Sequence, residues 1–128
     1  MPTSFAGAGT ALVTPFRADG SLDEAAFRLL VRRQIEGSID VLVPCGTTGE
    51  SVTMTAPEQE RVIALTLEEA AGRKPVLAGT GSNDTEAVVA RSRRAHGRSR
   101  SGVRVVPVGG GAANGCRMRL RRGSQTAA

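Results

Sequence analysis

Residues 41–54 read VLVPCGTTGESVTM, a short apolar run that stops at a turn rich in glycine, threonine and glutamate. The three residues that open this stretch include no polar side chain, which predicts a strand buried on both faces. Gly46 and Gly49 bracket two threonines, so the turn can bring two hydroxyls and backbone N–H groups close to one small ligand. In α/β proteins, active sites form at the carboxyl ends of parallel strands. The alternative is a purely structural turn in which Thr47 and Thr48 cap the local backbone.

Two further apolar runs predict strands at residues 10–14 (TALVT) and 76–78. The starts of the three strands, near residues 11, 41 and 76, are 30 and 35 residues apart. This is the spacing of β/α units that are joined by right-handed crossovers. The spacing alone allows a (β/α)8 barrel or an open doubly wound sheet.

An amphipathic helix is predicted between the first two strands. Ser21 and Glu24 fit a capping box at its start, and Gly37 sits where a left-handed residue would end it. The arginines at positions 28 and 32 fall away from the apolar stripe. That stripe consists of Phe27, Leu30, Val31 and Ile35.

Two more helices are predicted further along the chain. Thr55 and Glu58 form a second capping box, with Pro57 in the first turn, where N–H groups have no intrahelical partner. Gly72 ends this second helix. A third helix is predicted to begin near Glu86, capped by one of the two residues before it.

Three separate stretches, in the same order along the chain, resemble the dihydrodipicolinate synthase/N-acetylneuraminate lyase family. They are GTALVTPF with ADGSLD (residues 9–23), VPCGTTGES (residues 43–51) and PVLAGTGSN (residues 75–83). The resemblance covers roughly residues 5–90 and selects the TIM (β/α)8 barrel as the fold. It implies a pyruvate-dependent aldolase that works through a Schiff base. The CGTTGES form is similar to the synthase branch, which condenses pyruvate with aspartate semialdehyde in lysine biosynthesis.

The resemblance also implies roles for individual residues. Thr47 takes the position of the family's proton-relay threonine, and Thr48 takes the position that holds the pyruvate carboxylate together with backbone N–H groups at Gly46. Ser51 and Asn83 match residues that help bind the feedback inhibitor lysine at a dimer interface. The resemblance implies no metal and no cofactor, and it implies a homo-oligomer for the complete enzyme.

The rest of the family's catalytic machinery has no counterpart in this chain. The family uses a lysine on the sixth strand as the Schiff-base residue and two tyrosines as proton relays. This chain contains no tyrosine, and its one lysine, Lys74, precedes the third predicted strand. We therefore expect that this chain alone does not catalyse the family reaction.

Charge is distributed very unevenly along the chain. Residues 1–86 carry seven Lys/Arg and twelve Asp/Glu, a net charge of −5, whereas residues 87–128 carry ten Arg and no acid, a net charge of +10. We divide the chain into a partial TIM barrel of three β/α units (residues 1–90) and an Arg/Gly-rich tail (residues 91–128). One strand is plausible in the tail at residues 103–108, and the remainder is expected to be disordered. A frameshift near codons 84–91 would explain the composition of the tail.

Several alternatives stay open on the sequence alone. The complete protein could be a related 2-keto-3-deoxy-sugar aldolase or an N-acetylneuraminate lyase-type enzyme. The tail could neutralise nucleic-acid phosphates, but no aromatic residue is interleaved with the arginines to stack on bases. A chain with open sheet edges and an uncovered barrel interior could also be aggregation-prone and without function.

The length and composition of the chain limit these alternatives. The chain has 128 residues, about half of the roughly 250 that a complete barrel uses. No run approaches the ~18 apolar residues of a membrane span, and no signal peptide opens the chain. The expected location is therefore the cytoplasm.

Overall fold

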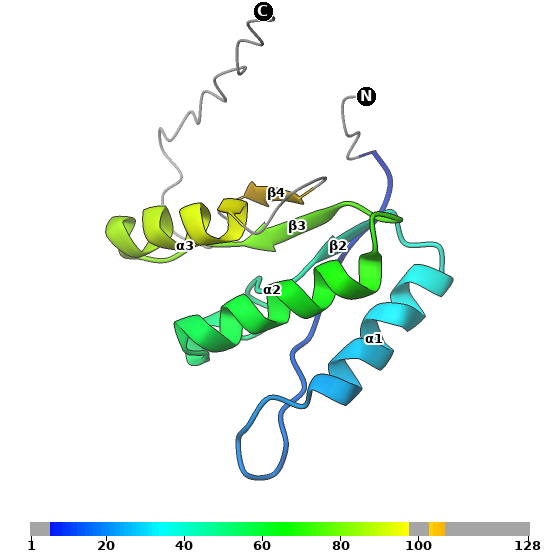
Figure 1. Ribbon diagram of the computed structural model, residues 1–128, viewed down its shortest axis with the longest axis horizontal. Helices are drawn as coiled ribbons and strands as arrows, with labels where there is room; N and C mark the ends of the chain where they lie inside the picture. Colours follow the sequence, from blue (N-terminus) through cyan, green and yellow to red (C-terminus); the bar gives the residue numbers. More distant parts are fainter. Residues whose placement is uncertain (1–5, 98–102, 107–128) are drawn as a thin grey trace, which may run out of the picture.

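The computed structural model describes residues 6–97 and 103–106. Strands and helices alternate along the chain (Figure 1). The strands are β1 (Gly9–Ala11), β2 (Val41–Val43), β3 (Val76–Gly79) and β4 (Val103–Val106). The helices are α1 (Glu24–Glu36), the 3-10 turn η1 (Ser51–Thr53), α2 (Ala56–Ala70) and α3 (Thr85–Gly97).

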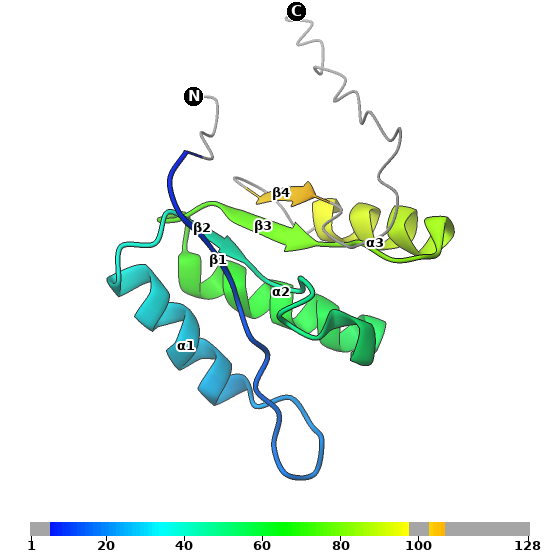
Figure 2. The same cartoon turned by 180° about the vertical axis from the view of Figure 1, so that it is seen from behind.

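The four strands form one parallel sheet in the order β1-β2-β3-β4. An open doubly wound sheet would reverse its strand order at a switch point, and no reversal occurs among these strands. Helix α1 packs against α2, and α2 packs against α3. In Figure 2, β1 and β2 lie in front of α2 with no helix between them and the viewer. Consecutive parallel strands with successive helices in contact are the arrangement of a (β/α)8 barrel, of which this chain forms an incomplete part.

The first helix begins differently from the sequence prediction. Asp23 is its N-cap, and the Asp23 side chain accepts a hydrogen bond from the Ala26 N–H at 3.0 Å. The Ser21 hydroxyl donates instead to Asp19 at 2.6 Å, and Glu24 bonds to Arg61. The predicted Ser21–Glu24 capping box is therefore wrong. Both Ser and Asp are good N-cap residues, and the helix starts immediately after the second of them.

The ends of the first two helices are set by residues in the left-handed region. Gly37 has φ −74°, and Ser38 beside it has φ 62°, so the predicted left-handed Gly37 is wrong. The predicted capping box of α2 is confirmed: the Glu58 N–H donates to Thr55 Oγ1 at 3.4 Å, and the Thr55 N–H donates to Glu58 Oε2 at 2.7 Å. Helix α2 ends at Ala70, and its C-cap is Ala71, which has φ 46°. The predicted end at Gly72 is therefore one residue late, although Gly72 is also left-handed, with φ 74°.

The third helix continues past residue 90, into the segment that the sequence assigns to a largely disordered tail. Small residues maintain the packing there, because Ser92 and Ala95 are both buried. Ser92 Oγ also lies 3.0 Å from Thr80 Oγ1 at the end of β3. Strand β4 then pairs with β3 and confirms residues 103–106 of the strand predicted at 103–108, whose last two residues lie outside the described ones. The expected disorder is therefore wrong for residues 91–97, which are helical, and for residues 98–102 and 107–128 it lies outside the described residues. The division of the chain at residue 90 stays a prediction.

The hydrophobic core lies between the sheet and the helices. Helix α1 contributes Phe27 and Val31, which are fully buried, and the core also takes in Leu42 of β2. Helix α2 buries a wide face, because Leu65 and Thr66 are buried as well as Val62 and Ile63. A helix with neighbours on two sides and a sheet below needs this wide buried face.

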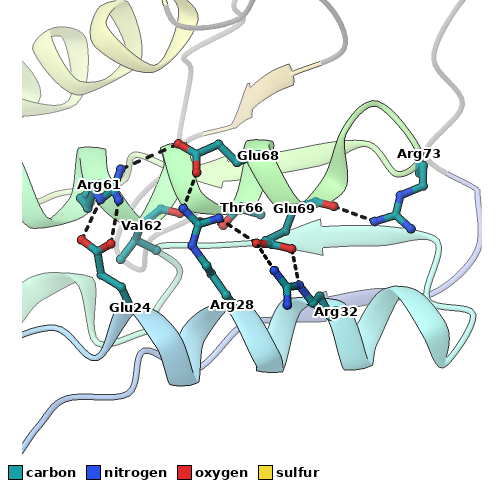
Figure 3. A network of polar contacts seen from close by, with 9 residues as sticks. All are labelled: Glu24, Arg28, Arg32, Arg61, Val62, Thr66, Glu68, Glu69 and Arg73. Atoms are coloured by element: carbon teal, nitrogen blue, oxygen red, sulfur yellow. Dashed lines mark hydrogen bonds and ion pairs between the residues drawn. The ribbon is translucent and has the colours of Figure 1, made fainter.

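Charged side chains join α1 to α2 along the outer surface (Figure 3). Arg28 donates to Glu69 at 2.7 Å and also bonds to Glu68, and Arg32 donates to both oxygens of Glu69 at 2.6 and 3.1 Å. The hydrogen bonds from Arg32 and Arg28 lower the pKa of Glu69 to about 2. Because these arginines are partly exposed, the network fixes the register of the two helices more than it adds stability.

Candidate functional site

The GTTG turn lies at the carboxyl end of β2, between the ends of β1 and β3. On one side, Thr14 Oγ1 donates a buried 2.7 Å hydrogen bond to the carbonyl oxygen of Gly49. On the other side, the Gly79 N–H donates to the carbonyl oxygen of Pro44 at 2.9 Å. Both neighbouring strands therefore hold the turn in place at the end of the sheet where barrel enzymes build their active sites.

The backbone of the turn is unusual at both ends. Cys45 has φ 57° and Glu50 has φ 55°, so two residues that carry a Cβ adopt the left-handed conformation. Such residues are uncommon, and they persist only where the surrounding structure determines them. Main-chain hydrogen bonds close the turn itself, from the Gly49 N–H to the Gly46 oxygen at 3.1 Å and from the Glu50 N–H to the Thr47 oxygen at 3.0 Å.

The three glycines around the turn differ in how much space a side chain would have. A Cβ on Gly79 would lie 2.2 Å from the carbonyl oxygen of Cys45, and one on Gly49 would lie 2.9 Å from that of Leu12. Both glycines allow close contact between backbones. A Cβ on Gly46 would meet no atom within 4 Å. No contact in the described chain requires a glycine at position 46, and close approach of a ligand is one physical reason for it.

The two threonines of the turn are exposed. Within residues 6–97 and 103–106, the hydroxyl of Thr47 makes no hydrogen bond, and neither does that of Thr48. The turn is closed by main-chain groups instead. The structural alternative, in which these threonines cap the local backbone, therefore has no support in the described part of the chain. The arrangement leaves two hydroxyl donors free on a turn that buried contacts hold in place.

The two residues that the resemblance assigns to an inhibitor site lie outside this turn. Ser51 begins η1 and is buried, and its carbonyl oxygen accepts from Gln59 Nε2 at 2.7 Å. Asn83 is exposed in the connection between β3 and α3. No hydrogen bond links Ser51 to Asn83 in the described structure, and their regulatory role stays a prediction.

Other reactive side chains do not converge on the turn. Burial raises the pKa of the Cys45 thiol to about 12, and its Sγ lies 3.6 Å from the carbonyl oxygen of Gln59. Lys74 precedes β3, so it lies at the amino end of the sheet, opposite the GTTG turn. Within the described ranges, no three His, Cys, Asp or Glu side chains are grouped to bind a metal ion.

Sequence reasoning missed Thr14 and Gly79 as parts of this site. Thr14 read as the last residue of a predicted strand, and Gly79 as part of a turn after one. A polar residue at the end of an apolar run was the available signal for Thr14.

Among the described helices, none has the length and apolarity needed to cross a membrane.

Residues 4–107 match the Dihydrodipicolinate synthetase family, and the chain belongs to this family. The match extends past residues 5–90, over which the sequence resembles this family, and it includes α3 and β4.

Named relatives agree with this assignment. The 4-hydroxy-tetrahydrodipicolinate synthase of Maridesulfovibrio salexigens is 58% identical over 86 residues, which are 67% of this chain and 29% of that protein. The dihydrodipicolinate synthase structure from Aquifex aeolicus has a TM-score of 0.72 and 40% identity, covering 79% of this chain and 34% of that one. The chloride-inhibited enzyme from Acinetobacter baumannii, complexed with pyruvate, has a TM-score of 0.72 and 34% identity, covering 73% and 32%. The chain spans about a third of the length of these relatives.

Proposed function

We propose that residues 46–48 form the pyruvate-binding part of a Schiff-base aldolase site, with Thr48 and backbone N–H groups holding the carboxylate and Thr47 relaying protons. The observation that carries this proposal is the pair of exposed threonine hydroxyls that make no hydrogen bond in the described chain. A carboxylate accepts several hydrogen bonds, and hydroxyl and N–H donors suit it. Although Gly46 is buried, a Cβ there would meet no atom within 4 Å, and we assign this space to the ligand. The pyruvate complex of the Acinetobacter relative supports this ligand class.

The complete protein, in this proposal, condenses pyruvate with aspartate semialdehyde as a 4-hydroxy-tetrahydrodipicolinate synthase. A lysine amine attacks the pyruvate carbonyl and water leaves, so that the resulting iminium makes the adjacent methyl group acidic. The names of the relatives favour this substrate pair over a keto-sugar aldolase. The chain itself has no lysine other than Lys74 and no tyrosine, so we propose that it binds pyruvate without turnover.

Ligand-observed NMR of the full 128-residue chain with pyruvate tests the binding step. Saturation transfer to pyruvate is expected for the wild type and is expected to fall strongly in Thr48→Val and Gly46→Ala. Thr53→Val is the matched control, because Thr53 lies in the following 3-10 turn and its hydroxyl already bonds to Glu50. An unchanged signal in both site variants would contradict the assignment.

Borohydride reduction in the presence of pyruvate tests the catalytic step separately. The mass of the chain is expected to stay unchanged, because Lys74 lies at the opposite end of the sheet from the turn. A pyruvate adduct on Lys74 would overturn this part of the proposal.

For the complete enzyme we also propose a cytoplasmic homo-oligomer in which Ser51 and Asn83 contribute to lysine inhibition. Lysine inhibition curves of the complete enzyme, with Ser51→Ala and Asn83→Ala, test this assignment. Inhibition that is unchanged in both variants would remove these residues from the regulatory site.

A further inference from the structure

Glu50, which follows the GTTG turn, has a backbone conformation that its own side chain does not explain. Its φ is 55°, in the left-handed region, where a residue with a Cβ persists only if the surrounding structure determines it. Because Glu50 is exposed, burial of its side chain does not hold it there. The hydrogen bonds of the neighbouring backbone must therefore maintain this conformation.

The peptide group that joins Gly49 to Glu50 is held at both of its polar atoms. The Thr14 hydroxyl donates to its carbonyl oxygen at 2.7 Å, and its N–H donates to the carbonyl oxygen of Thr47 at 3.0 Å. A peptide group is planar, so its C=O and N–H turn together. Rotation of this one group would bring φ of Glu50 back towards ordinary negative values, and it would break both hydrogen bonds at once.

The backbone on either side of this peptide group is also held. Before it, the Gly49 N–H donates to the Gly46 carbonyl oxygen at 3.1 Å. After it, the Ser51 carbonyl oxygen accepts from the buried side chain of Gln59 at 2.7 Å. Rotation of the peptide group between residues 49 and 50 is therefore the simplest way for the turn to relax, and the Thr14 hydroxyl is the side-chain group that prevents it.

We propose that Thr14 is a positioning residue for pyruvate binding, an inference that rests on the function proposed above for residues 46–48. Rotation of the peptide group would take away the N–H that closes the turn on Thr47, and both threonines of the turn would lose their fixed positions. Thr14 is 4% exposed and its hydroxyl is already bonded, so it acts through the turn and does not contact the ligand. A binding site whose groups are fixed in advance does not lose affinity to the ordering of those groups.

Pyruvate titrations of the full 128-residue chain, followed by ligand-observed NMR, test this role. Thr14→Val keeps the shape of the side chain without its donor, and it is expected to raise the dissociation constant of pyruvate about tenfold. Thr14→Ser keeps the hydroxyl and is expected to bind like the wild type. Thr66→Val is the matched control, because the buried Thr66 hydroxyl donates to the Val62 carbonyl oxygen at 2.8 Å within α2, and it is expected to leave the affinity unchanged.

Amide hydrogen exchange of residues 46–51, followed by mass spectrometry without ligand, measures the hold on the turn directly. Exchange in this segment is expected to be faster in Thr14→Val than in the wild type and in Thr66→Val. Circular dichroism checks that each variant folds. Should Thr14→Val be unfolded, Thr14→Cys replaces it, because a thiol is a weak donor, and the same results are expected.

The two measurements separate this inference from the proposed function. A wild type that binds no pyruvate would overturn the proposed function, whereas the exchange data would still show whether Thr14 fixes the turn. Unchanged exchange in Thr14→Val would overturn the positioning role, and so would an unchanged pyruvate affinity in that variant or an equal loss of affinity in Thr66→Val. A loss of affinity in Thr14→Ser as large as in Thr14→Val would also overturn it, because serine keeps the donor.

Discussion

The hydroxyl of Thr14 donates a 2.7 Å hydrogen bond to the carbonyl oxygen of Gly49, across 35 residues of sequence. Thr14 follows β1 and is only 4% exposed, while Gly49 closes the GTTG turn. This bond fixes one side of the turn to the first strand, and the contact between Gly79 and the Cys45 backbone fixes the other side to the third. Three strands therefore hold the candidate site in place, although Thr47 and Thr48 both follow β2.

Thr14→Val is expected to lower the free energy of unfolding by about 1–3 kcal/mol, because it leaves the Gly49 carbonyl buried without its partner. Urea denaturation measures this change. Thr53→Val is the control, since the Thr53 hydroxyl bonds to the Glu50 carbonyl in an exposed position, and its expected effect is below about 0.5 kcal/mol. Equal effects in the two variants would contradict a special role for Thr14.

Gly79→Ala is expected to destabilise the fold by roughly 1–3 kcal/mol or more, because its Cβ would overlap the carbonyl of Cys45 and push the turn away from β3. Gly46→Ala has space for its Cβ and is expected to change stability by less than about 1 kcal/mol. Thermal and urea denaturation of both variants measures the difference. A Gly46→Ala variant as unstable as Gly79→Ala would show that position 46 is constrained by the chain itself.

The sequence predicted the existence and order of the strands and helices and the capping box of α2, because each depends on residues close together in the chain. It placed the first strand at residues 10–14, which is wrong for residues 12–14, because β1 spans Gly9–Ala11. It assigned the start of α1 to the wrong residue, since Ser21 and Asp23 are both suitable caps two positions apart. It could not give the contacts of Arg28 with Glu69 or of Thr14 with Gly49, which join segments far apart in sequence. The threonines of the turn were identifiable because the motif itself is local.

Acid is expected to weaken the fold through Glu69. Hydrogen bonds from Arg32 and Arg28 hold the pKa of Glu69 at about 2 in the folded chain, below its ordinary value of 4.5. The stabilisation is present above pH 4.5 and is lost as the pH falls from about 4.5 to 2, because the unfolded chain binds the proton first. Glu69→Gln is expected to reduce this pH dependence in urea denaturation between pH 2 and 5. The exposed Glu36, at the end of α1, provides the control Glu36→Gln, which is expected to keep it.

Cys45 is expected to resist alkylation while the chain is folded. The thiol is buried and burial raises its pKa to about 12, so almost no thiolate is present at pH 8. In a Cys116→Ser background, Cys45 is the only thiol in the chain, and iodoacetamide labelling followed by mass spectrometry measures its reactivity. Labelling is expected to become rapid in urea. Rapid labelling in the folded state would mean that the turn opens locally without global unfolding.

Downstream of β4, another reading frame is expected to encode the missing catalytic residues. The family match extends to residue 107, and β4 pairs in register with β3, so any change of frame belongs after these residues and not near codons 84–91. Resequencing the gene from codon 80 onward and translating all three frames checks this. A tyrosine pair followed by a strand that carries a lysine, over about the remaining length of a barrel, is the expected result. If no frame contains them, the basic tail is genuine, and the binding of pyruvate without turnover becomes the function to explain.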